Sequence, residues 1–223
     1  MTRTRTWRGV RLYTVGHSTR TLDELLELLF AFEVTVLADV RTIPRSRHNP
    51  QFNADALRSA LREGRLRYVH VPELGGLRRS REDSPNTGFH NASFRGFADY
   101  MLTPEFQAGL EKLRALASEG SVAVMCAEAV PWRCHRSLIA DALTARGARV
   151  EHITSRTRAS PHRMTPFAVV HGARVTYPGE PQKEVAVAGR TRRPARIKPA
   201  GQGASRARGR RSRSVEPNPA RHP

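Results

Sequence analysis

Short apolar runs alternate along the chain with segments whose apolar residues recur every three or four positions. The short runs are bounded by glycine, proline or charged residues, which is typical of buried strands. The run over residues 34–40 is almost continuously apolar, as in a strand that is covered on both faces. The pattern predicts strands over residues 12–15, 34–40, 67–71, 122–125 and 149–153.

The helical period fills the segments between these strands. Thr21 and Glu24 have the spacing of a capping box, and Thr103 followed by Pro104 is a typical helix start. The pattern predicts helices over residues 21–29, 53–63, 94–101, 104–119 and 137–146. Strands that alternate with helices indicate βαβ units. The predicted fold class is therefore α/β, a single domain with a mainly parallel, Rossmann-like sheet flanked by helices.

The composition changes near Ala188 and predicts three segments. Residues 1–11 form an N-terminal extension, residues 12–180 the α/β domain and residues 188–223 a disordered, arginine-rich tail. The tail holds eleven basic residues, one acidic residue and no aromatic residue. So few apolar groups cannot offset the entropy that ordering costs. Such a tail either binds polyanions or only improves solubility, and the sequence favours neither.

The charge of the whole chain narrows the expected partners and location. Its 223 residues include 38 Lys and Arg against 20 Asp and Glu, a net charge of +18. So basic a chain attracts nucleic acid and other polyanions at low salt, although such arginine enrichment is also typical of GC-rich bacterial genes. No apolar run is long enough for a membrane span, and no signal-like segment is visible. With only two cysteines, both expected to be reduced, we predict a cytoplasmic protein without a membrane partner.

The ends of the predicted strands carry the residues with the most distinctive chemistry. Parallel sheets bind ligands beyond the carboxyl ends of their strands. Each of these residues has a structural explanation by itself, such as core packing for a cysteine. Their coincidence at one predicted edge favours a functional site. The residues are His17, Ser18, Asp39, Arg41, Cys126, Glu128, Cys134, His135 and Arg136.

The same residues lie in motifs that resemble a known family. The motifs are Thr14-Val15-Gly16-His17-Ser18, Asp39-Val40-Arg41 with Pro44 and Ser46, Leu74-Gly75-Gly76, the segment 94–101, Met125-Cys126-Ala127-Glu128, Cys134-His135-Arg136, and His162 within residues 161–165. Over about residues 13–178 the chain resembles the bacterial family called domain of unknown function 488 (DUF488). The resemblance implies a fold and site residues, among them His162, but no reaction.

A catalytic thiol is the preferred chemistry for the cysteine motif. A position at a helix N-terminus favours the thiolate of Cys134. His135 or His17 would carry protons, with Glu128 as acid or base. Arg136 would meet an anion, which is a ligand group or, in a purely structural role, the carboxylate of Glu128 or Asp39.

Metal binding is the second interpretation of the motif. Cys126, Cys134, His135 and His17 are soft ligands, but their spacing matches no zinc ribbon or finger. On a helix, the adjacent Cys134 and His135 would point about 100° apart, so they would not easily share an ion. A disulfide between Cys126 and Cys134 is a further redox state to consider, although a cytosolic protein seldom keeps one.

Nucleic-acid binding is the third interpretation. Arg45, Arg47 and the run from Arg78 to Arg81 add basic loops, but aromatic residues make up only 6% of the chain. An extensive base-stacking platform is therefore not expected.

The sequence thus favours an uncharacterised enzyme, or an enzyme-like ligand-binding domain, for an anionic substrate. No cofactor is predicted. The alternative is a nucleic-acid-associated accessory protein that uses its basic tail and loops. The predicted catalytic residues are His17, Cys126, Glu128, Cys134 and His135, and the predicted substrate-binding residues are Ser18, Asp39, Arg41, Arg136 and His162.

Overall fold

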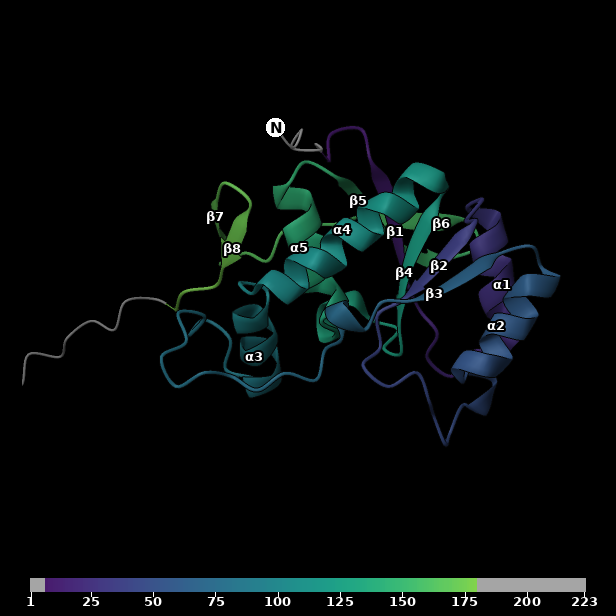
Figure 1. Cartoon of the computed structure of the whole chain (residues 1–223), viewed down its shortest axis with the longest axis horizontal. Coiled ribbons are helices and arrows are strands. Elements are labelled where there is room, and N and C mark those ends of the chain that lie inside the picture. Colours follow the sequence, from purple (N-terminus) through teal and green to yellow (C-terminus); the bar gives the residue numbers. More distant parts are fainter. Residues whose placement is uncertain (1–6, 180–223) are drawn as a thin grey trace, which may run out of the picture. The chain divides into compact units, whose positions relative to one another are not determined.

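A six-stranded sheet lies between two layers of helices in the computed structural model, which describes residues 7–179 (Figure 1). The strand order is β3-β2-β4-β1-β5-β6. The first five strands of the chain pair in parallel, and β6 pairs antiparallel with β5. The predicted α/β class with a mainly parallel sheet is confirmed. The strands are β1 (Arg11–Gly16), β2 (Val36–Asp39), β3 (Arg67–His70), β4 (Val122–Cys126), β5 (Arg149–Ser155) and β6 (Arg158–Pro161).

Each face of the sheet has its own helices and its own apolar core. Helices α1 (Leu22–Ala31) and α2 (Ala54–Glu63) pack on one face. Helices α3 (Ala92–Tyr100), α4 (Pro104–Glu119) and α5 (Arg136–Ala145) pack on the other. Short 3-10 helices are η1 (Pro50–Phe52), η2 (Pro72–Leu74) and η3 (Pro131–Arg133).

Strand β4 shows why the central strands are apolar throughout. Val122, Val124 and Cys126 belong to the core on the α3–α5 side, whereas Ala123 and Met125 belong to the core under α1 and α2. Successive side chains of a strand point to opposite faces, so a strand covered on both sides needs apolar residues at every position.

The local signals at the helix ends act as the sequence predicts. The Thr21 hydroxyl accepts the Glu24 backbone N–H at 3.1 Å, and the Thr21 backbone N–H donates to the Glu24 carboxylate at 2.7 Å. This capping box starts α1. At α4, the Thr103 hydroxyl accepts the Phe106 backbone N–H, and Pro104 is the first helical residue.

The C-terminal part of the domain contains strands that the sequence pattern does not reveal. They are β6 and a hairpin of β7 (Val169–His171) and β8 (Arg174–Thr176). The residues of β7 are all exposed, so they carry no alternation to detect. At the other end, Trp7 is buried in the core, upstream of the predicted start at residue 12. The predicted tail, residues 188–223, lies outside the described residues.

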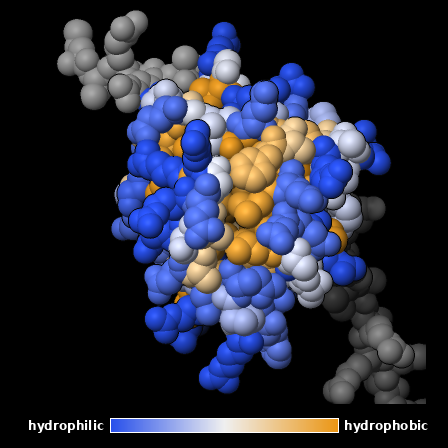
Figure 2. All heavy atoms as spheres, turned by 90° about the vertical axis from the view of Figure 1, so that its right-hand side faces the viewer, coloured by the Kyte–Doolittle hydropathy of each residue, from blue (hydrophilic) through white to orange (hydrophobic). Residues whose placement is uncertain are grey.

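Figure 2 views the molecule from the side on which α1 and α2 lie, the right-hand side of Figure 1. Apolar groups form a strip there between hydrophilic side chains. Phe30 of α1 is half exposed and is among the large apolar side chains that reach the surface. Among the helices within residues 7–179, none has the length and apolar character that crossing a membrane requires.

Candidate functional site

A cavity of about 620 Å³ opens at the carboxyl ends of β1, β2 and β4. These strands are neighbours in the sheet, so their ends meet at one edge, as expected for a ligand site of this fold. We call this space the site cavity. Seven of the ten predicted site residues line it: His17, Ser18, Arg41, Cys126, Glu128, Cys134 and His135.

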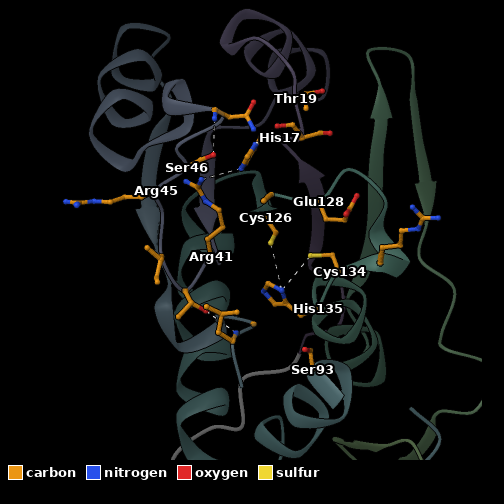
Figure 3. Close-up of a pocket in the computed structure, with 18 of the residues that line it drawn as sticks. His17, Thr19, Arg41, Arg45, Ser46, Ser93, Cys126, Glu128, Cys134 and His135 are labelled. Carbon is orange, nitrogen blue, oxygen red and sulfur yellow. Dashed lines mark hydrogen bonds between the residues drawn. The ribbon is translucent and has the colours of Figure 1, made fainter. Parts of the chain in front are cut away.

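Two thiols and an imidazole meet in this cavity (Figure 3). Cys126 ends β4, Cys134 follows η3, and His135 is the N-cap residue of α5. The His135 Nδ1 atom lies 3.9 Å from Cys126 Sγ and 3.6 Å from Cys134 Sγ. Both thiols are buried and free. We call these three residues the thiol cluster. Within residues 7–179, the thiol cluster is the one group of three or more histidine, cysteine or carboxylate side chains whose ligand atoms lie close enough together to hold a metal ion.

The local backbone corrects the expectation that Cys134 and His135 diverge. Cys134 has extended backbone angles, φ −131° and ψ 146°, and α5 begins only at Arg136. The Cys134 backbone N–H donates to the Pro131 carbonyl at 3.0 Å, which closes η3 before the helix begins. Because neither residue is inside the helix, the angle of about 100° between helical neighbours does not apply.

The thiols of the cluster shift each other's pKa in opposite directions. The pKa of Cys134 is lowered, mainly because Cys126 donates a hydrogen bond to it, with further contributions from His135 and Arg136. The pKa of Cys126 is raised well above its ordinary value, because it donates that bond and because it is buried. Without a bound cation, one thiolate and one thiol are the favoured pair.

His135 is held so that one ring nitrogen faces the thiols. Its Nε2–H donates to the Val40 carbonyl at 3.3 Å, which leaves Nδ1 as the acceptor. Phe97 packs against the ring, with centroids 4.9 Å apart. A Cβ at Gly76 would lie 2.8 Å from the ring Cε1, so only glycine allows the backbone to pass this close to the His135 ring. The Gly75-Gly76 motif thus has a role that sequence reasoning missed.

His17 has both ring nitrogens engaged within the protein. Nδ1 donates to the Ser18 carbonyl at 2.9 Å, and Nε2 accepts from Arg41 Nη1 at 3.3 Å. The ring stacks on Phe52 at a centroid distance of 4.2 Å. Burial lowers the pKa of His17, so the neutral ring is favoured. The geometry makes His17 a support for Arg41.

Asp39 lies behind the cavity wall and does not line the site cavity. It is fully buried and pairs with Arg41, with Nη2 to Oδ2 at 2.6 Å. It also accepts the Tyr68 hydroxyl at 2.8 Å. The pair offsets the charge of Arg41, which reaches the cavity from the end of β2.

Arg136 also lies outside the site cavity. Its side chain is 1% exposed and donates from Nη2 to the Glu128 backbone carbonyl at 2.6 Å. Its Nη1 approaches the Thr14 hydroxyl at 3.4 Å. The partners are the backbone carbonyls of Glu128 and Ala129 and a hydroxyl, and not the carboxylates of Glu128 or Asp39 that the sequence suggested. Arg136 therefore ties the loop after β4 to the sheet.

His162 is placed in a different part of the domain. It is hydrogen-bonded to Asp141 at 2.7 Å and to His152 at 2.9 Å. It lines a second cavity of about 900 Å³, together with Trp132 and Phe167. The structure does not bring it to the thiol cluster.

The remaining charges of the site cavity favour an anion. Arg45 and Arg133 line it and are exposed, and Glu128 is the acid among the lining residues. Figure 3 shows Arg45 extending away from the thiols. The Glu128 carboxylate accepts the Val130 backbone N–H at 3.2 Å. Sequence reasoning missed Arg133, whose position next to Cys134 was the available signal.

The comparison with protein families confirms the resemblance that the motifs indicate. A family model described as "Domain of unknown function DUF488" matches residues 21–143, more than half of the chain. The chain belongs to the DUF488 family. The matched region of this DUF488 protein runs from the capping residue of α1 into α5, so it includes Arg41 and the thiol cluster. Comparisons with curated proteins and with solved structures found no match.

Proposed function

We propose that this DUF488 protein is an enzyme, or an enzyme-like ligand-binding domain, that takes a small anionic substrate in the site cavity. One observation carries the proposal: all five predicted catalytic residues, which lie at the ends of β1, β4 and η3 and at the start of α5, line one cavity. Its volume of about 620 Å³ lies within the range of pockets that enclose small molecules. Chemically reactive groups that converge in a cavity of this size are typical of an active site.

The charges around the cavity support an anionic substrate. The two positive charges of Arg45 and Arg133 exceed the single negative charge of Glu128. The charge of Arg41 is offset by its ion pair with Asp39. Arginine side chains bind phosphate and carboxylate groups through charge-assisted hydrogen bonds. Ile43, Leu77 and Phe94 add apolar walls. A compact molecule with one anionic group and an apolar part fits these walls.

Inorganic phosphate and malonate test this function as mimics of phosphorylated and carboxylated substrates. Each should raise the melting temperature of the protein at constant ionic strength, because a ligand that binds only the folded state stabilises it. Arg133→Gln and Arg45→Gln should each weaken anion binding about tenfold, because each removes a charge-assisted bond. The readout is the melting temperature against anion concentration.

The matched control is Arg163→Gln, which removes an exposed arginine that lines the second cavity. It should respond to both anions as the unaltered protein does. If neither anion stabilises the protein, or all three variants respond alike, then the anionic substrate is wrong.

A second function is favoured by the composition of the tail. We infer that residues 188–223 bind nucleic acid through phosphate contacts, because they hold eleven basic residues and one acidic residue. Without aromatic residues, the segment offers no stacking surface for bases. Binding of this kind is independent of sequence and suits an accessory protein in the cytoplasm.

Deletion of residues 188–223 should remove most of the affinity for a random DNA duplex. The affinity of the full chain should fall steeply as salt rises, because each neutralised phosphate releases counterions. The truncated chain should lose most of this salt dependence and keep the melting temperature of the domain. Fluorescence anisotropy at several salt concentrations measures both effects.

A full-length control with the ten tail arginines replaced by glutamine separates charge from length. It should behave like the truncated chain. An unchanged salt slope after truncation would contradict the inference and assign binding to the loops around Arg45 and Arg78.

A further inference from the structure

We propose that Cys126, Cys134 and His135 form a Zn²⁺ site with one coordination position open to the site cavity. The metal site itself follows from the geometry of the thiol cluster. That a substrate anion reaches the open position rests on the proposed function.

The distances within the thiol cluster match those between ligands of one tetrahedral ion. Zinc lies about 2.3 Å from sulfur and about 2.0–2.1 Å from imidazole nitrogen, so tetrahedral angles place sulfur and nitrogen roughly 3.6 Å apart. The observed distances from His135 Nδ1 are 3.6 Å to Cys134 Sγ and 3.9 Å to Cys126 Sγ. All three ligand atoms lie within 4.8 Å of one another. Both sulfur–nitrogen distances are therefore within a few tenths of an ångström of the tetrahedral value.

The second ring nitrogen of His135 has the partner that metal-binding histidines need. Histidine ligands usually donate their other N–H to a carbonyl or carboxylate, which fixes the tautomer and turns the lone pair toward the metal. His135 donates Nε2–H to the Val40 carbonyl at the end of β2, and Nδ1 faces both thiols. Phe97 and Gly76 confine the ring from other sides.

The backbone around the thiols is also held in place. The Cys126 carbonyl accepts the His17 backbone N–H at 3.0 Å, and β4 lies between β1 and β2. Cys134 is fixed by its backbone bond to Pro131. A site whose ligands are already positioned loses little entropy when it binds an ion. Two thiolates would balance the charge of a divalent cation, and thiolate with imidazole is a typical ligand set for zinc.

The number of ligands indicates what kind of zinc site this is. Structural zinc sites use four protein ligands, whereas catalytic sites use three and keep a fourth position for water or substrate. Within residues 7–179, no fourth histidine, cysteine or carboxylate joins the group. All three members line the site cavity, into which the fourth position therefore opens. An anion held near Arg133 could supply an oxygen to that position.

Metal titration of the full-length protein, reduced and freed of metal with a chelator, tests the site. Cobalt(II) should bind one equivalent and give thiolate-to-metal charge-transfer absorption with the intense visible bands of a tetrahedral ion. Zinc should displace the cobalt. Cys126→Ser and Cys134→Ser should each reduce the charge-transfer absorption by about half and weaken zinc binding more than about 100-fold. His135→Gln should weaken zinc binding while it keeps both sulfur ligands.

The matched control is His48→Gln, which removes an exposed histidine outside the site. It should leave the stoichiometry, spectrum and affinity unchanged. Gly76→Ala gives a second variant in which all ligands remain, because a Cβ there would displace the His135 ring. It should also weaken zinc binding, so the test does not depend on the folding of the cysteine variants.

Three results would overturn the site: no one-to-one complex, cobalt bound without sulfur charge transfer, or unchanged zinc affinity in both cysteine variants and Gly76→Ala. A separate experiment tests whether an anion reaches the open coordination position. Phosphate or malonate added to the cobalt complex should change its visible spectrum if the open position takes the anion. If zinc binds but neither anion stabilises the protein or alters the spectrum, the proposed function fails while the metal site stands.

Discussion

Replacement of Asp39 by alanine is expected to lower the free energy of unfolding by about 3–5 kcal/mol. The substitution leaves Arg41 buried without its partner, and it also removes the acceptor of the Tyr68 hydroxyl. Taking one member from a buried ion pair is costly because the remaining charge keeps its desolvation penalty. Denaturant unfolding monitored by circular dichroism measures the change.

The matched control is Asp83→Ala, at the exposed ion pair of Asp83 with Arg81. Water solvates both groups there, so no measurable loss of stability is expected. Equal losses in the two variants would show that burial of the Asp39–Arg41 pair does not determine its contribution.

Replacement of Gly16 by alanine is expected to destabilise the protein by about 3 kcal/mol or more. Gly16 ends β1 beside the loop that follows β4. A Cβ there would lie 2.6 Å from the Glu128 carbonyl carbon and 2.8 Å from the Ala129 Cα. Both neighbours are backbone atoms, so the loop itself must move. That movement would also lengthen the bond from Arg136 to the Glu128 carbonyl.

Gly64→Ala is the control for this substitution. The Cβ at Gly64 would meet two side-chain ends and no backbone atom at close range, the Phe30 ring at 2.9 Å and Leu66 Cδ1 at 3.1 Å. The half-exposed Phe30 can turn away, and the end of the Leu66 side chain needs to move by only a few tenths of an ångström. A change of less than about 1 kcal/mol is expected. A Gly16 variant as stable as the Gly64 variant would mean that the loop after β4 adapts without cost. The two are compared by thermal and denaturant unfolding.

Local patterns in the chain determine the elements of this fold. The apolar run at residues 34–40 predicts a strand covered on both faces, and β2 is an interior strand of the sheet, between β3 and β4. The Thr21–Glu24 capping box and the Thr103-Pro104 pair mark the starts of α1 and α4, because a helix cap is made within a few residues. Parallel strand ends meet at one edge, so the pattern also located the site cavity.

Long-range packing decides which of the predicted site residues line the site cavity and which lie elsewhere. His17, Cys126 and Cys134 line one cavity, yet Asp39 lies behind Arg41, and His162 reaches another cavity. These outcomes depend on strand order and on which side chain covers which, and neither is encoded within a few residues. The antiparallel β6 and the β7–β8 hairpin depend on tertiary contacts in the same way.

The thiol cluster shows most clearly what the sequence determines and what only the tertiary structure decides. The cysteine motif identified Cys126, Cys134 and His135 from the sequence alone, because their residue types and their place after a buried strand are local properties. Their common orientation was not local. It depends on the extended backbone of Cys134, on the Val40 carbonyl from β2 and on the missing side chain of Gly76. These contacts come from three distant segments, so only the folded chain brings two thiols and one ring nitrogen to a single point.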